Sequence, residues 1–139
     1  MRPAKKMAKY LVCLLTALIL EIIPYSAVLV FGNLKENGEM ERITHYYSSF
    51  SLVPFGNANF APLITAVLTC VLIFITFIGI VTGKEKILDS ARFVTAITAV
   101  ISAFPLVVFL YSWVSLMISA LLCIQWNILR HDFSTKTSL

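Results

Sequence analysis

One acidic residue, Glu21, lies inside an otherwise uncharged stretch that runs from Leu11 to Leu34. A helix of about 20 apolar residues is long enough to cross the roughly 30 Å hydrocarbon core of a bilayer. An ionised carboxylate near the middle of such a helix costs roughly 2.5 to 3.5 kcal/mol to insert, and intramembrane acids are typical of proton and ion sites. The apolar stretches contain no lysine or arginine that could pair with it. Glu21 is therefore the first candidate for chemistry.

Other polar groups are expected at the depth of Glu21. Pro24 cannot donate a hydrogen bond to the carbonyl of Leu20, which leaves an acceptor beside the carboxyl group. Threonines and serines also recur along one face of each later apolar stretch. These hydroxyls either form an intramembrane site with the carboxyl group or line ordinary helix contacts, where small and hydroxyl residues allow close approach. The predicted polar site consists of Glu21, Tyr25, Thr69, Thr98 and Ser119.

The composition of the chain indicates a membrane protein. Apolar residues make up 59% of the chain and charged residues 13%, with a mean hydropathy of +0.89. In soluble domains, roughly a quarter of all residues are charged. A soluble enzyme domain, a nucleic-acid-binding protein and a disordered tail are therefore excluded. The net charge is +4, and we expect the protein to have the lipid bilayer, not nucleic acid, as its partner.

The uncharged stretches predict an all-α membrane protein, a single domain over residues 1–139 folded as an antiparallel four-helix transmembrane bundle. The last stretch, between Arg92 and Arg130, would be about 55 Å long as one helix and must fold back once. We place this turn near residues 110–112, with a turn at Pro105 as the alternative. Pro24 and Pro105 then become helix kinks. The predicted spans cover about 10–31, 60–82, 89–109 and 113–130.

The basic residues predict how the bundle is oriented. Nine of the 11 lysines and arginines lie on one side of the predicted spans, and only Lys35 and Arg42 lie on the other. Short cytoplasmic loops hold such an excess, so we expect a cell-membrane protein with both termini in the cytoplasm. A cleaved secretory signal is the alternative for the N-terminus, because basic residues precede the apolar run Leu11 to Leu20.

The predicted outside loop covers residues 33–59. Asn37-Gly38 predicts a turn, and Met40, Ile43, Tyr47 and Phe50 recur at helical spacing, which predicts a short helix lying on the membrane interface. Its second half is rich in aromatic residues, which collect at the headgroup level. The loop is either an aromatic connector or a surface for a partner or ligand.

Several kinds of chemistry have no signature in this sequence. Cys13, Cys70 and Cys123 form no C-x-x-C motif, and His45 and His131 fall in different loops, so we expect neither a metal nor a cofactor. Phosphate-binding loops, hydrolase motifs and paired intramembrane carboxylates are also absent from the sequence. We therefore predict that the protein is not an enzyme.

A lone glutamate in the first of four short spans resembles the small multidrug resistance transporters, in which that residue exchanges protons for cationic drugs. The long loop after the first span and the strong charge bias depart from that family, so no family is assigned. The preferred hypothesis is a non-catalytic accessory or partner-binding subunit, in contact with another membrane protein or a second copy of itself. The alternative is a small oligomeric proton-coupled transporter or channel that uses Glu21.

Overall fold

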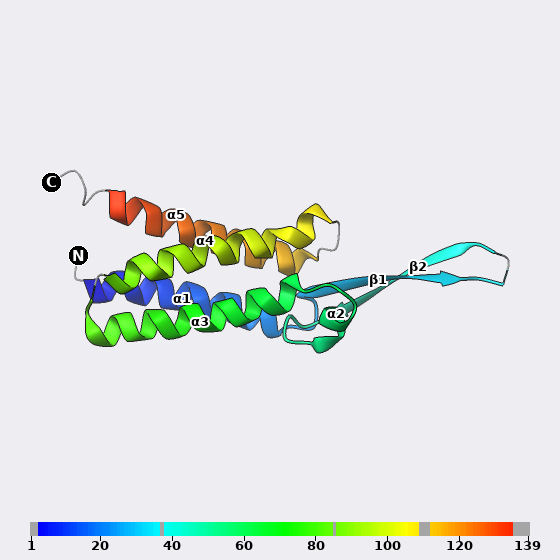
Figure 1. The fold of residues 1–139 in the computed structure, drawn as a ribbon, viewed down its shortest axis with the longest axis horizontal. Helices are drawn as coiled ribbons and strands as arrows, with labels where there is room; N and C mark the ends of the chain where they lie inside the picture. Colours follow the sequence, from blue (N-terminus) through cyan, green and yellow to red (C-terminus); the bar gives the residue numbers. More distant parts are fainter. Residues whose placement is uncertain (1–2, 37, 85, 109–111, 135–139) are drawn as a thin grey trace.

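The computed structural model describes residues 3–36, 38–84, 86–108 and 112–134. Four long helices lie side by side, and two strands form a hairpin that projects far beyond one end of them (Figure 1). The elements, in chain order, are α1 (Pro3–Ile22), β1 (Ala27–Leu34), β2 (Met40–Tyr47), α2 (Leu52–Gly56), α3 (Ala61–Thr82), α4 (Lys86–Val107) and α5 (Trp113–Ser134).

The long helices contact one another in a closed order: α1 packs on α3 and α5, and α4 packs on the same two helices. Among the described residues, three helical segments are long and apolar enough to cross a membrane, namely Ala61–Thr82, Asp89–Val107 and Trp113–Arg130. Helix α1 is of similar length, but its first two turns contain three lysines. The described ends of the chain lie together at the end opposite the hairpin (Figure 1).

The helices bury small and hydroxylated side chains and expose large apolar ones. Thr69, Thr95 and Thr98 are fully buried, whereas Phe74 and Phe93 are 65% and 69% exposed. A water-soluble domain would show the opposite distribution, because apolar surface is driven out of water. In lipid, small and hydroxylated residues are the usual contacts between helices. This distribution supports a membrane protein.

Local sequence explains where these candidate spanning helices begin and end. Pro62 is tolerated in the first turn of α3, where its missing N–H has no intrahelical partner to lose. Gly83 ends this helix with a φ of 64°, and its N–H donates to the carbonyl of Gly79 at 2.9 Å. Ser112 and Ser115 cap α5 reciprocally, because each side-chain oxygen accepts from the backbone N–H of the other residue.

Helices α3, α4 and α5 cover the second to fourth predicted spans, with ends within a few residues of those predicted. Pro105 lies inside α4, two residues before its end, so it does not open α5. The predicted turn near residues 110–112 falls largely on residues 110 and 111, which lie outside the described residues.

The first predicted span, 10–31, is wrong in its second half. Helix α1 ends at Ile22, so Pro24 lies in the turn after the helix and does not kink it. Strand β1 starts at Ala27, where β-branched and aromatic residues favour an extended backbone. The uncharged stretch thus continues past the helix because strand β1 is also apolar, and hydropathy does not distinguish the two.

The predicted interfacial helix in the loop 33–59 is also wrong. Residues 40–47 form β2, which pairs antiparallel with β1 from Ala27 opposite Tyr47 to Leu34 opposite Met40. The hairpin reverses around Gly38, where a glycine accommodates the φ of 81°. Cross-strand pairing with β1 outweighed the helical spacing of apolar residues. The helix that the region does contain is the short α2.

Candidate functional site

Glu21 lies in the last turn of α1, not near the middle of a helix as predicted, because the helix ends at Ile22; its side chain is completely buried. The hydroxyl of Thr69 on α3 donates a hydrogen bond of 2.8 Å to its Oε1 atom. The Oε2 atom is also buried and has no hydrogen-bond partner among the described residues. The carboxyl group is therefore half satisfied, which is an unusual state for a buried polar group.

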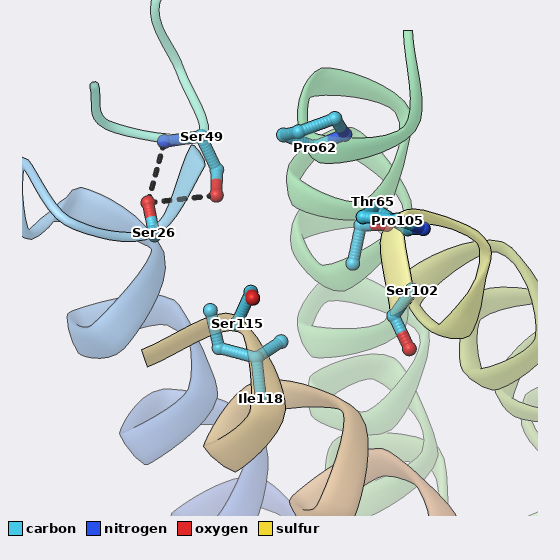
Figure 2. A pocket seen from close by; sticks show the side chains of 8 residues that line it. All are labelled: Ser26, Ser49, Pro62, Thr65, Ser102, Pro105, Ser115 and Ile118. Carbon is cyan, nitrogen blue, oxygen red and sulfur yellow. Dashed lines mark hydrogen bonds between the residues drawn. The ribbon is translucent and has the colours of Figure 1, made fainter. Parts of the chain in front are cut away.

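The main chain of Glu21 makes a separate set of contacts. Its carbonyl oxygen accepts from the hydroxyl of Ser26 and from the backbone N–H of Ser49, both at 2.9 Å. The Ser26 hydroxyl oxygen in turn accepts from the N–H and the hydroxyl of Ser49, at 2.7 and 2.8 Å (Figure 2). These bonds satisfy a carbonyl at the open end of α1. They also join that end to both sides of the hairpin base.

The other predicted members of the polar site make their contacts elsewhere and not with the carboxyl group of Glu21. Thr98 donates to the carbonyl of Val94 at 2.7 Å, and Ser119 donates across the helix contact to the carbonyl of Ser102 at 2.8 Å. Tyr25 is 55% exposed and lies against Tyr46 on the hairpin. Among the contacts described, only Thr69 of the predicted set hydrogen-bonds the Glu21 side chain.

Most of the buried threonines direct their hydroxyls back to their own helix. Thr65 and Thr95 each donate to the carbonyl four residues earlier, at 2.8 and 2.7 Å. The hydroxyl of Thr69 also lies 3.0 Å from the carbonyl of Thr65, and its single proton is shared between that carbonyl and the carboxyl group of Glu21. A hydroxyl bonded in this way needs no partner on another helix. The stripes of hydroxyls therefore provide small, satisfied surfaces for helix contact.

A small cavity lies at the hairpin end of the long helices (Figure 2). Its volume of about 20 Å³ is enough for one water molecule. Pro105 lies at its wall, and a proline there leaves the carbonyl of Ile101 without its usual helical donor. Such a cavity suits a bound water and is too small for an organic substrate. The lining residues are Ser26, Ser49, Pro62, Thr65, Ser102, Pro105, Ser115 and Ile118.

Sequence reasoning missed several buried polar residues. Ser49 reaches Ser26 only through the register of the hairpin, for which the sequence holds no local signal. Asn59 donates through Nδ2 to the carbonyl of Val28 at 3.0 Å, which depends on the same long-range pairing. Gln125 is 2% exposed and its Oε1 has no partner among the described residues. The isolation of Gln125 in an apolar stretch could have identified it, as isolation identified Glu21.

The site offers a carboxyl group and hydroxyls but no metal-binding set. Within the described ranges, no group of three or more histidine, cysteine or acidic residues is placed to hold a metal ion. Cys13, Cys70 and Cys123 are free cysteines. The chemistry available at Glu21 is therefore hydrogen bonding and proton uptake or release at one carboxyl group.

Comparison of the chain with models of known protein families, with curated proteins and with solved structures found no match.

Proposed function

We propose that this membrane protein is a non-catalytic accessory subunit that binds a partner protein through the hairpin β1–β2. In this proposal all four long helices lie in the bilayer of the cell membrane as an antiparallel bundle. Both termini face the cytoplasm, and the hairpin stands on the opposite side. Glu21 is a buried hydrogen-bonding anchor at the junction between helices and hairpin.

The form of the hairpin is the observation that carries the proposal. Its two eight-residue strands extend beyond the helices as a two-stranded sheet (Figure 1). Leu34 and Met40, at its far end, are 70% and 76% exposed. A lone hairpin is marginally stable in water, and its unpaired edges are templates for another strand. Addition of a partner strand is a recurrent mode of peptide and protein recognition, and it would cover these edges.

The mounting of the hairpin also supports a role in recognition. Its base is fixed to the end of α1 by the bonds among Glu21, Ser26 and Ser49. A further bond joins Asn59, just before α3, to Val28 of β1. The hairpin is thus held by helices on two sides. Rigid mounting lowers the conformational entropy lost on binding.

Charge distribution supports the proposed orientation. Lys9, Lys84, Lys86 and Arg92 belong to the end of the helices at which the chain termini lie. The hairpin end contributes Lys35 and Arg42, and Lys35 is paired with Glu41 at 3.4 Å. Basic residues accumulate on the cytoplasmic side of membrane proteins. The packing of α1 against both α3 and α5 supports its membership of the bundle.

Site-specific photo-crosslinking in native membranes tests the proposal. A photoreactive amino acid replaces Val30 on the hairpin, and in a matched control it replaces Phe74, which is 65% exposed on α3. We expect one discrete protein adduct from the hairpin site that the control does not give. The adduct should disappear when Phe31, on the same strand, is replaced by Asp. Identical products from both sites, or none from the hairpin, would contradict partner binding by the hairpin.

The unpartnered Oε2 of Glu21 favours the second candidate, a small oligomeric proton-coupled transporter or channel. Glu21→Gln separates the two because glutamine preserves size and hydrogen bonding but does not titrate. The accessory proposal expects the variant to fold and to keep the hairpin crosslink. Proton flux in liposomes that is present in the unmodified protein and lost in a folded Gln variant would favour the transporter.

A further inference from the structure

An aromatic cup lies at the base of the hairpin, beside the start of α5. We define it by its lining residues Tyr25, Tyr46, Ser112, Trp113 and Val114. Its volume of about 540 Å³ falls within the usual range for small-molecule sites, roughly 300 to 1,000 Å³. The cup is separate from the small cavity beside Ser26 and Ser49, because the two share no lining residue.

Three of the five lining residues are aromatic and present open surface. The ring centroids of Tyr25 and Tyr46 lie 5.5 Å apart, and the two ring planes are tilted by 51° relative to each other. Trp113 is 85% exposed and contributes a third wall. Ser112 donates a hydrogen bond to the main-chain carbonyl of Tyr25, which fixes the α5 wall relative to the tyrosine wall.

The chemistry of this lining selects a particular class of cation. Aromatic faces attract cations, and cages of several rings recognise quaternary ammonium groups. None of the lining residues is acidic, and the hydroxyl oxygen of Ser112 already accepts from the N–H of Ser115. A primary ammonium would lose its hydrogen bonds to water here without a carboxylate to replace them. A quaternary ammonium has no N–H group and loses none.

We propose that the aromatic cup binds a quaternary ammonium group, such as that of choline, which is a binding activity beyond the proposed recognition of a partner by the hairpin. The cup lies at the end of a candidate span, where lipid headgroups would surround it. The ligand is therefore the headgroup of a choline lipid or a small soluble quaternary amine. The positive end of the α5 dipole opposes a cation, so we expect a dissociation constant on the order of 1 mM.

The purified full-length protein in a choline-free detergent provides the test. Trp126→Phe leaves Trp113 as the single tryptophan, so its fluorescence reports on the cup. Choline and tetramethylammonium should change this fluorescence saturably. The uncharged analogue 3,3-dimethylbutanol has a similar shape and should bind at least about fivefold more weakly, because cation–π attraction requires the charge. Saturation-transfer NMR on the methyl protons provides a second measure of contact.

Substitutions at Tyr46 test the role of the aromatic ring, and a substitution at the adjacent Tyr47 is the control. Tyr46→Leu should weaken choline binding about fivefold, whereas Tyr46→Phe, which preserves the aromatic face, should bind as the unmodified protein does. Tyr47→Leu is the matched control, because adjacent residues of a strand point to opposite faces. Equal binding of the uncharged analogue, an equal effect of both leucine variants, or no binding by either method would overturn the proposal.

Nanodiscs distinguish the two sources of the ligand. If the headgroup of a choline lipid reaches the cup, phosphatidylcholine discs should suppress binding of free choline relative to phosphatidylglycerol discs. Equal binding in both discs assigns the cup to a soluble amine. Either result supports quaternary ammonium binding, and absence of binding in both discs contradicts it.

Discussion

Replacement of Ser26 by alanine should loosen the hairpin from the helices. Ser26 is 3% exposed, and its hydroxyl oxygen is the acceptor for both the N–H and the hydroxyl of Ser49. In the variant the Ser49 N–H still reaches the Glu21 carbonyl at 2.9 Å, but the Ser49 hydroxyl loses its acceptor. A buried donor left unsatisfied costs about 1 to 3 kcal/mol. We expect the free energy of unfolding to fall by about 1.5 kcal/mol.

Unfolding in mixed micelles, followed by tryptophan fluorescence, measures this change. Ser48→Ala is the matched control, because the described bond of the Ser48 hydroxyl is a local one, from the N–H of Phe50. This variant should change the free energy of unfolding by less than about 0.5 kcal/mol. Ser26→Ala combined with Ser49→Ala removes the unsatisfied donor as well, so the double variant should be more stable than the sum of the single effects implies. Strict additivity, or a Ser26 effect as small as that of Ser48, would refute the role of this hydrogen-bond network.

Three further predictions concern the helices and their orientation. Thr69→Val should lower the free energy of unfolding by about 0.6 kcal/mol, the average for a hydrogen bond between membrane helices, whereas Thr95→Val loses only an intrahelical bond and should change it less in the same assay. Gly83→Ala should cost about 1 kcal/mol by the same measurement, because a φ of 64° is strained for alanine. In a variant whose native cysteines are replaced by alanine, Lys35→Cys should react with an impermeant maleimide in intact cells and Lys84→Cys should not; the reverse pattern would contradict the proposed orientation.

The helices that are apolar enough to span a membrane could be predicted because each depends mainly on its own sequence. An uncharged stretch of the length of α3 is uncommon outside membranes, and its ends are marked locally by Pro62 and Gly83. The hairpin could not be predicted in this way. Strand β1 is continuous in hydropathy with α1, and its strand character depends on pairing with β2, which follows later in the chain. The helical spacing of Met40, Ile43 and Tyr47 was a coincidence, because these residues lie in a strand.

The candidate site also contains residues that local sequence predicts and residues that depend on long-range pairing. Glu21 was visible because a charge in an apolar stretch is rare, and Thr69 was placed near it by periodicity and depth. Tyr25 was grouped with Glu21 because the helix was expected to continue past Ile22. Once the helix ends there, Tyr25 leaves the helix face and contacts Tyr46 instead. Ser49 depends on the hairpin register, so no property of its own segment indicates its contact with Ser26.

The main chain and the side chain of Glu21 have different roles, and this difference separates the two candidate functions. Its carbonyl oxygen joins Ser26 and Ser49, and any residue at this position could supply that contact. Its side chain makes one described hydrogen bond, worth about 0.6 kcal/mol on average, and it is fully buried, where an ionised carboxylate without a charged partner is strongly unfavourable. The side chain is therefore a poor source of stability unless it is protonated. Because substitution of Glu21 leaves the hairpin anchor intact, and substitution of Ser26 leaves the carboxyl group intact, partner binding should respond to Ser26 and any proton transport should respond to Glu21.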